Sequence, residues 1–509
     1  MRGAWPTAGV VAGFAGLATS YFVAMAMTIR DSPVVAVAEL VIRITPGPLA
    51  EKAISVVGTK DKPILVGVVL VLCGLLFAWA GALARRSWWA PLLVLVPLAA
   101  VGVVAVSVQR GATAVDVLPV VLGFVTWLLC LWLLTAPLRR VEEAPVDERT
   151  GGAVRSRRAF LAGAGLMAAA AVALAMVGRV VGRGRRHVEE TRRLLRLPGV
   201  SQPIVPARAT LDLDGISPWM TSADDFYRIH TAIVVPAIEP TDWQLRIHGM
   251  VDREVVLTYD DLVARRITEG WITLNCVSNP VGGPLIGNAW WSGVRLADLL
   301  AEAGVQDGAD AVLQTSDDGW SCGTPLDTLT DGRKAMLAVA MNGEPLPIDH
   351  GFPVRTIVPG LYGYVSACKW VVDMKVTRFD EISAYWTRRG WGERGPVKIS
   401  SRIDVPRSGD EVDPGTVRVG GVAWAQHIGI ERVEVAVDGG DWQPAEVSRP
   451  STSDAWVQWV ASVPLEAGDH VVRVRATDRD GLVQTGVERD VLPDGATGWH
   501  SVDFSVRGS

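Results

Sequence analysis

A single cysteine, Cys276, stands at the end of a short apolar stretch and directly before a glycine-rich run. Trp271–Leu274 is apolar and β-prone, which predicts a buried strand that ends at the polar pair Asn275-Cys276. Asn279-Pro280 and the glycines after it predict a turn, so the thiol is presented where strand meets loop. A thiolate there suits a soft metal centre, because one protein ligand leaves the other coordination positions to a cofactor or substrate. A lone cysteine is also often a small buried apolar residue, and the local sequence leaves both interpretations open.

Composition divides the chain into two unlike parts. Its 509 residues are enough for three or four domains, and the net charge of −5 gives no indication of nucleic-acid binding. Residues 1–185 are dominated by Ala, Val, Leu and Gly, whereas the remainder resembles ordinary soluble protein. None of the five cysteines stands in a CxxC or CxxCH pattern. That argues against a disulfide framework, a zinc knuckle and a c-type haem.

Apolar stretches in the first part predict about five transmembrane helices. They cover residues 7–29, 63–84, 88–108, 115–136 and 159–180. Arginines follow the second and the fourth stretch, so the positive-inside rule places the N-terminus in the cytoplasm and everything after residue 180 outside. Residues 33–58 mix charged and apolar side chains, which predicts an amphipathic helix at the membrane surface rather than a sixth span.

Ser156–Leu161, just before the fifth stretch, resembles a twin-arginine export signal. Arg157 and Arg158 are followed by Phe-Leu and a run of small apolar residues. Such a signal exports folded domains, which suits a protein whose cofactor is inserted before export. The arginines could equally mark only the cytoplasmic end of a helix. The first histidine is His187, which excludes a bis-histidine haem within the predicted spans.

After a linker at residues 186–204, two further domains are predicted. Residues 205–394 alternate short strand patterns, turns and a few helices, which indicates an α+β domain. Residues 395–509 carry strand patterns at 416–424, 430–437, 456–463 and 470–478, separated by Asp-Gly turns. This spacing favours an immunoglobulin-like β-sandwich.

Six motifs in the α+β region occur in an order that resembles the sulfite oxidase family of molybdenum-cofactor enzymes. They are FYRIH at 226–230, TLNC at 273–276, IGNAWW at 286–291, MNGEPLP at 341–347, HGFPVR at 350–355 and SACKW at 366–370. The resemblance extends over residues 205–500 and implies a sulfite-oxidase-type molybdopterin domain between a transmembrane helical bundle and the β-sandwich. The second domain resembles the family's dimerisation domain, which implies a possible homodimer.

The resemblance implies that Cys276 ligates molybdenum beside the dithiolene of one molybdopterin. By motif position it assigns pterin and phosphate binding to Phe226, Tyr227, Arg228, Ile229, His230, Asp317, His350, Arg355, Ser366, Ala367, Cys368 and Lys369. Cations beside glycine-bounded backbone suit an anionic phosphate and a pterin edge rich in donors and acceptors. It also implies that Arg228 orients an anionic or oxo substrate.

Two positions depart from the family pattern. Val281 stands five residues after the cysteine, where sulfite oxidases have an arginine that binds the oxyanion. Trp391, which the resemblance places in the catalytic site, follows Arg388-Arg389-Gly390 where the family has a tyrosine. The pocket is therefore expected to be more apolar and to hold sulfite, a compact dianion, less well. SACKW is also one residue longer than the usual motif, which blurs the match at Ala367 and Cys368.

The sequence therefore predicts a membrane-anchored molybdenum oxidoreductase with its catalytic domain outside the cytoplasm. Oxygen-atom transfer on sulfite or a related small substrate is expected, with electrons exchanged with a separate electron-transfer protein or membrane redox subunit. One alternative is a sulfoxide or N-oxide reductase of the same family, which the missing arginine favours. Another, from a different class, is a cofactor-free membrane receptor.

Overall fold

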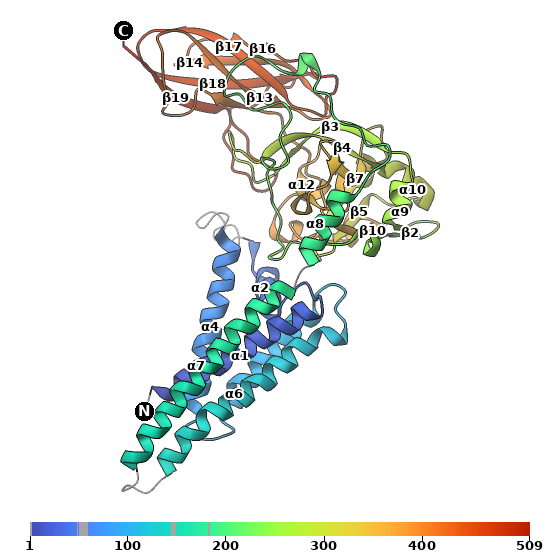
Figure 1. The fold of residues 1–509 in the computed structure, drawn as a ribbon. Helices are drawn as coiled ribbons and strands as arrows, with labels where there is room; N and C mark the ends of the chain where they lie inside the picture. Colours follow the sequence, from blue (N-terminus) through green and yellow to red (C-terminus); the bar gives the residue numbers. More distant parts are fainter. Residues whose placement is uncertain (1–2, 48, 50–59, 144–148, 182–183, 509) are drawn as a thin grey trace. The chain divides into compact units, whose positions relative to one another are not determined.

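The computed structural model describes residues 3–47, 49, 60–143, 149–181 and 184–508, which fall into two compact units. One unit, here called the helical unit, comprises Met1–Val188 and Ala232–Pro236. The other, the β-rich unit, comprises Glu189–Thr231 and Ala237–Ser509. Figure 1 shows long helices in the first and sheets in the second.

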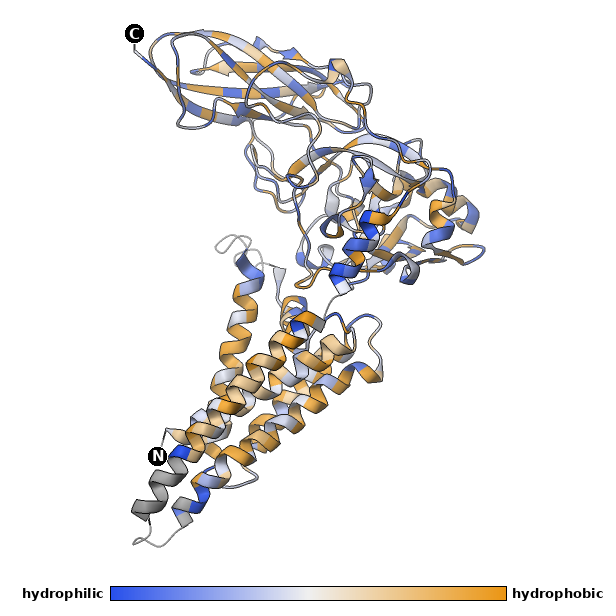
Figure 2. Cartoon of the chain, viewed as in Figure 1, coloured by the Kyte–Doolittle hydropathy of each residue, from blue (hydrophilic) through white to orange (hydrophobic). Residues whose placement is uncertain are grey.

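Long apolar helices build the helical unit. They are α1 (Ala4–Ala26), α2 (Pro33–Ile44), α4 (Asp61–Leu83), α5 (Leu92–Ser107), α6 (Leu118–Glu143) and α7 (Arg149–Val181), with a short 3-10 turn η2 (Ala114–Val117) before α6. Figure 2 shows that apolar residues cover most of their length. Large side chains such as Leu72 and Leu93 are 54% and 77% exposed. Apolar surface on this scale requires a partner other than water.

Glycines on α1 allow its neighbours to approach closely. A Cβ atom on Gly9 would lie 2.0 Å from the Phe77 carbonyl oxygen, and one on Gly16 would lie 1.9 Å from the Trp127 ring. The Trp127 indole donates a hydrogen bond to the Gly13 carbonyl oxygen at 2.9 Å. Small residues at such crossings replace side-chain packing by backbone contact, as helix pairs in membranes commonly do.

The same contacts fix the directions of the helices. Gly9 lies against Gly81 while Gly13 lies against Phe77, so α4 runs antiparallel to α1. Gly16 lies against Gly123 and Gly13 against Trp127, so α6 is antiparallel to α1 as well. Because α4 and α6 run in the same direction, the chain between them, which contains α5, must return along the length of the unit.

Four helical stretches are long and apolar enough to cross a membrane: Ala4–Ala26, Asp61–Leu83, Ala114–Arg140 and Arg158–Leu194. The third predicted span falls short, because α5 has 16 residues, about 24 Å of helix, against about 30 Å of hydrocarbon. The predicted surface helix is found as α2, which has 12 residues and is not a span. Most of the remainder of its predicted range, residues 48 and 50–58, lies outside the described residues.

Two five-stranded sheets form the first part of the β-rich unit. Their strand orders are β2-β1-β10-β5-β6 and β3-β4-β7-β8, with β9 paired to β7. The strands are β1 (Gln244–Gly249), β2 (Val255–Thr258), β3 (Thr268–Asn275), β4 (Ile286–Arg295), β5 (Ala311–Ser316), β6 (Ser321–Pro325), β7 (Met336–Met341), β8 (Glu344–Pro345), β9 (Arg355–Ile357) and β10 (Val371–Thr377). The short helices are α9 (Tyr259–Val263), α10 (Leu296–Ala303), α11 (Leu326–Thr330) and α12 (Gly363–Ser366). One buried core that includes Leu245, Leu299 and Val376 joins helices and strands.

The second part of the β-rich unit packs two sheets around a core of its own. Their orders are β11-β13-β17-β16 and β12-β19-β18-β14-β15. The strands are β11 (Ser400–Val405), β12 (Glu411–Val412), β13 (Gly415–Trp424), β14 (Ile430–Val437), β15 (Gln443–Pro444), β16 (Glu446–Val447), β17 (Val457–Leu465), β18 (Gly468–Asp478) and β19 (His500–Val506). Trp459 from one sheet and Val474 from the other are fully buried in this core. All four strands expected from the alternating pattern are present.

A helix lies within the predicted linker. The linker was expected at residues 186–204, and α8 covers Gly184–Leu194. Glu189 pairs with Arg192 at 2.8 Å and with Arg193 at 3.0 Å, spacings that support a helix from within. Val188 on the same helix is buried. Part of the predicted linker is therefore helical.

The close approach of α1 and α4 predicts different outcomes for two glycines of α4. Gly81→Ala is expected to lower the melting temperature of the detergent-solubilised chain, because its Cβ would lie 2.2 Å from the Trp5 carbonyl oxygen. Gly67→Ala, with nothing within 4 Å, is the matched control and should gain the usual helix propensity, about 1 kcal/mol. Equal melting temperatures for the two variants would contradict this packing.

Candidate functional site

Cys276 lies immediately after strand β3, on the loop that leads into β4. Its backbone N–H donates to the Leu285 carbonyl oxygen at 3.0 Å. The Asn279 side chain accepts from the Leu285 N–H at 2.8 Å, and the Asn279 N–H donates to the Cys276 carbonyl oxygen at 3.1 Å. Gly282, with φ +75°, completes the turn. The thiol therefore sits on a loop closed by hydrogen bonds at both ends, as the sequence predicted.

Strand β3 is also tied to the C-terminal part of the unit. The Thr273 hydroxyl donates to Asn288 at 3.0 Å and accepts from the Trp456 backbone N–H at 2.8 Å. The Gln426 amide donates to the Asn275 side-chain oxygen. All of these groups are buried, so each bond left unmade would cost the desolvation of a polar group. The position of Cys276 thus depends on residues far along the chain.

Burial raises the pKa of the Cys276 thiol, while hydrogen bonds from Ser278 act in the opposite direction. A bound metal cation would reverse this balance and favour the thiolate. Burial, followed by the charge of Cys276, raises the pKa of both Tyr227 and Tyr362, that of Tyr362 to about 12. Both phenols therefore lie close enough to sense the sulfur, and both keep their protons at neutral pH.

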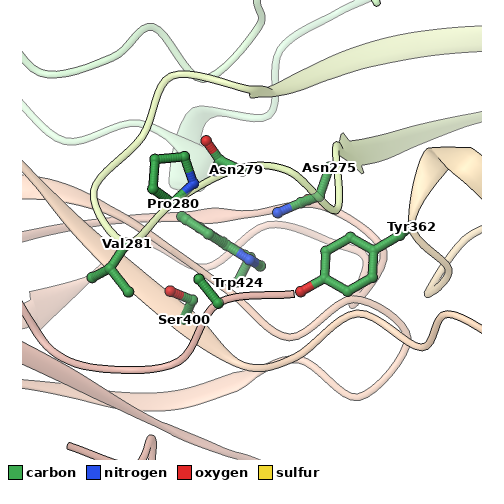
Figure 3. Close-up of a pocket in the computed structure, with 8 residues that line it drawn as sticks. Asn275, Asn279, Pro280, Val281, Tyr362, Ser400 and Trp424 are labelled. Carbon is green, nitrogen blue, oxygen red and sulfur yellow. The ribbon is translucent and has the colours of Figure 1, made fainter. Parts of the chain in front are cut away.

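A cavity opens beside the cysteine loop, between the first and second parts of the β-rich unit (Figure 3). It is lined by Asn275, Asn279, Pro280, Val281, Tyr362, Ser400, Trp424 and Ala496. In Figure 3 the Tyr362 hydroxyl and the Asn275 side-chain nitrogen point into it. None of the eight lining residues is charged. The cavity therefore offers hydrogen bonds and apolar walls.

Buried groups near His350 lack the partners that they require. Arg355, only 4% exposed, donates to the His350 carbonyl oxygen at 3.0 Å and to the Ala367 carbonyl oxygen at 3.4 Å. Its Nε has no hydrogen-bond partner among the described residues, and within them it forms no ion pair. Burial lowers its pKa to about 10. A buried guanidinium with an open donor fits an anionic ligand.

The His350 ring is buried and neutral. Its Nε2 lies 2.8 Å from the Ala223 carbonyl oxygen and therefore carries the proton. Burial, and then the charges of Lys369 and Arg355, lower its pKa to about 3. Its Nδ1 has no partner among the described residues and is left as an acceptor. Arg355 therefore offers a ligand a positive charge and an N–H donor, and His350 offers it an acceptor nitrogen.

The FYRIH motif reaches both this cluster and the cysteine loop. Phe226 is buried and packs edge-on against His350, with ring centroids 5.8 Å apart. It covers Gly287, where a Cβ would lie 2.7 Å from the Phe226 ring. A Cβ on Gly363 would lie 3.5 Å from the Tyr227 hydroxyl and 3.6 Å from the Asn275 carbonyl oxygen. The Tyr227 hydroxyl and the backbone next to Cys276 thus both lie beside Gly363.

Other residues of the predicted set surround the same cluster. Lys369 donates from Nζ to the Asp349 carbonyl oxygen at 2.9 Å, and the Asp317 N–H donates to the Trp370 carbonyl oxygen at 2.9 Å. The His230 ring lies 5.9 Å from Trp370. The Ser366 hydroxyl is fully buried and donates to the carbonyl oxygens of residues 361 and 362. Cys368 is also buried, with its N–H bonded to Thr356.

Comparison with known proteins agrees with this geometry. The profile of the oxidoreductase molybdopterin binding domain matches residues 232–386, and that of the Mo-co oxidoreductase dimerisation domain matches residues 396–506. Human mitochondrial sulfite oxidase is 31% identical over 338 residues, which are 55% of this chain and 60% of that protein. The uncharacterized oxidoreductase YuiH of Bacillus subtilis is 33% identical over 180 residues, 35% of this chain and 87% of that protein. The chain belongs to the sulfite oxidase family of molybdopterin oxidoreductases.

This membership makes the chain an oxidoreductase whose cofactor is molybdenum bound to molybdopterin. The orphaned donor of Arg355 and acceptor of His350 fit the phosphate and the pterin edge, and Cys276 fits the metal. The cofactor-free receptor alternative is therefore set aside. The chain spans 60% of the length of the human sulfite oxidase, and both profile matches begin after α8.

A solved structure, the sulfane dehydrogenase SoxCD of Paracoccus pantotrophus, aligns with a TM-score of 0.49 at 23% identity, over 64% of this chain and 92% of that chain.

Arg228 and Trp391, which the family resemblance assigned to the catalytic site, do not line the cavity beside Cys276. The Arg228 side chain is 49% exposed, 3.7 Å from Asp349, and Ile229 is also exposed. Trp391 is buried in the core against Tyr364 and Trp386 and does not line the cavity. No described contact joins Arg228 or Trp391 to Cys276.

Several cavity residues were missed from the sequence. Tyr362 brings a hydroxyl to the cysteine loop, and its only signal is its place between glycines in Pro359–Gly363. Ser400, Trp424 and Ala496 come from the second part of the unit, where no local pattern marks them. Val281, singled out as a departure from the family, does line the cavity.

Arg355 gives a direct test of the cofactor cluster. Arg355→Met should lower pterin and molybdenum per purified chain by about tenfold or more, because charge-assisted hydrogen bonds to an anion are lost. Pterin fluorescence after oxidation and elemental mass spectrometry measure the two. Arg246→Met, which removes an exposed ion pair with Glu254, should retain both. Unchanged cofactor content in Arg355→Met would exclude this residue from the site.

Gly282 tests how tightly the cysteine loop is held against the C-terminal part. A Cβ on Gly282 would lie 2.1 Å from the His500 ring, whereas one on Gly481 would meet nothing within 4 Å. Both glycines have positive φ, +75° and +85°, so alanine strains both backbones by about 1–2 kcal/mol. Gly282→Ala should therefore lose turnover and alter the visible spectrum of the metal centre, while Gly481→Ala should not. Identical spectra and rates would contradict the contact.

Proposed function

We propose that the chain transfers an oxygen atom to or from a small neutral substrate with an S–O or N–O bond, and exchanges electrons with a separate redox protein. The uncharged cavity beside Cys276 carries this proposal. A sulfite dianion entering it would lose its hydration without gaining an ionic partner, which is unfavourable. A sulfoxide or N-oxide needs only a hydrogen bond to its oxygen and an apolar wall for its substituent.

Cations near the cavity are already engaged. Lys398 donates from Nζ to the Gly495 carbonyl oxygen at 2.9 Å, next to Ala496. Arg402 donates to the Gly283 carbonyl oxygen at 2.9 Å and pairs with Asp404 at 2.7 Å. These side chains hold the walls, and the charge of Arg402 is compensated by Asp404.

The chain's own residues would bind and orient the substrate. The protonated Tyr362 hydroxyl and the Asn275 amide can donate to its oxygen, since the Asn275 side-chain oxygen is occupied by Gln426. Pro280, Val281 and Trp424 would contact its apolar part and exclude water. When bound, the cofactor supplies two-electron oxygen-atom exchange, with Cys276 as the protein ligand of the metal.

Sulfite oxidation is the second candidate. It is supported by the identity of 31% with human sulfite oxidase and by the matching dimerisation domain. That domain also supports a homodimer, and its two packed sheets support the immunoglobulin-like assignment. We propose domains at 1–185, 205–394 and 395–509.

We further propose that the helical unit is embedded in lipid of the cell membrane, with the β-rich unit outside the cytoplasm. Arg85 pairs with Glu142 at 3.0 Å, and Arg139 donates to the Ala84 carbonyl oxygen at 2.8 Å, so the arginines at the C-terminal ends of α4 and α6 lie together. The positive-inside rule makes this end cytoplasmic. The four long helices, together with the shorter α5 that returns between α4 and α6, then leave the chain outside. The motif at 156–161, within α7, would serve as a twin-arginine signal.

The substrate proposal can be tested at Val281. Reduction of a sulfoxide or N-oxide with a reduced viologen dye, and oxidation of sulfite with ferricyanide, would be measured on the purified full chain. Val281→Arg should raise kcat/KM for sulfite by about tenfold and lower it for the neutral substrate, because it introduces a cation into the cavity. Val281→Met, of similar length without charge, is the control. A wild-type chain that oxidises sulfite efficiently and reduces neither oxide would overturn the proposal.

A further inference from the structure

Immediately after the FYRIH motif, a short segment of the chain packs with the helical unit. Residues Ala232–Pro236, here called the inserted segment, belong to the helical unit, although the residues before and after them belong to the β-rich unit. Only Thr231 separates the inserted segment from His230, the last residue of the motif. The position of the motif is therefore constrained by whatever holds this segment.

Helices α2 and α4 hold the inserted segment by its backbone. Lys62, in the first turn of α4, donates from Nζ to the Ala232 carbonyl oxygen at 2.8 Å. Glu39, on α2, accepts from the Ile233 backbone N–H at 3.4 Å. Ala232 is 3% exposed, and Ile233 packs against the core of the helical unit. Contacts of both polar and apolar kinds therefore fix these residues.

Glu39 is buried, in a position where an ionised carboxylate is energetically unfavourable. It is 6% exposed, and burial, followed by the charge of Asp31, raises its pKa to about 7. A short network supports it: Gln109 donates to Glu39 at 3.1 Å, and Arg43 donates to Gln109 at 2.9 Å. A helical unit that only anchored the chain would be more stable with an apolar residue here. The network is explained if the Glu39 carboxylate is needed to accept the hydrogen bond from the Ile233 backbone.

The motif depends on such an anchor because it has no regular structure of its own. Among the described residues no helix or strand occurs between the 3-10 turns at Ala207–Ala209 and Pro240–Asp242. Phe226 is fixed by packing against Trp291 and His350, but Arg228 and Ile229 are exposed. Without ladder hydrogen bonds, a loop is ordered only by its points of attachment. Phe226 is one such point, the His230 ring beside Trp370 is another, and the inserted segment follows two residues after His230.

We propose that Lys62 and Glu39 are positioning residues for the cofactor site: by holding the inserted segment, the helical unit keeps the FYRIH motif in its binding conformation. The helical unit then serves as part of the cofactor's scaffold in addition to anchoring the chain. This inference rests on the proposed role of residues 226–230 in binding the pterin.

The test compares two lysines at the start of α4 in the purified, cofactor-loaded full chain. Lys62→Met should release pterin on the order of tenfold faster during repeated dilution, as expected for the loss of a charged hydrogen bond. It should also speed proteolytic cleavage within residues 224–239. Lys60→Met, which alters an exposed lysine beside the same helix, should match the wild type in both measurements. Lys62→Arg, which keeps a charged donor, should restore slow release.

The outcomes distinguish a failure of the proposed function from a failure of the positioning role. A wild-type chain without pterin would overturn the proposed function itself. Pterin release and cleavage that are the same in Lys62→Met and the wild type would overturn only the positioning role. If Lys62→Met does not fold, Ile233→Ala changes the same attachment from the side of the segment, and unchanged release and cleavage in that variant would equally refute the proposal.

Discussion

The buried hydrogen bonds between strand β3 and the C-terminal part of the β-rich unit determine where Cys276 stands. Thr273 and Asn275 sit within the last three residues of that strand, and both are bonded to groups from beyond residue 420. Polar groups buried in this way tolerate little displacement, because a bond lost in the interior is not replaced by water. Cys276, the cavity wall and the second domain are therefore held together by the same buried hydrogen bonds. A domain whose profile is named for dimerisation thus also shapes the site in its own chain.

Electrostatics link the cofactor to stability. Arg355 is buried without an ion pair among the described residues, and His350 is held neutral beside it. Such groups destabilise a protein that lacks their ligand. An anion that binds them recovers this free energy, so the loaded chain should be markedly more stable than the empty one. The cysteine behaves in the same way, since burial disfavours the thiolate until a cation is present.

Sequence patterns predicted the structural features that depend on residues close together in the chain. Alternating residues located the C-terminal strands, and the apolar stretch at Trp271–Leu274 located β3. Ordered motifs indicated a family whose cofactor suits the cluster around Arg355. What the sequence did not predict arises from contacts between distant segments: Trp424 in the cavity, Trp391 in the core, and the inserted segment among the helices. The helix in the predicted linker was missed because charge pairs one turn apart, rather than an apolar stripe, support it.

The separation along the chain of the groups that meet at β3 has a consequence for biosynthesis. Thr273 bonds to a residue 183 positions later, and Asn275 to one 151 positions later. During translation the cysteine therefore leaves the ribosome long before the residues that fix its strand have been made. Contacts of such long range also form late in folding. A nascent or truncated chain would carry the thiol but not the complete cavity. Proteolytic loss of the C-terminal domain would accordingly remove Ser400, Trp424 and Ala496 from the cavity wall and the bonds that hold the end of β3.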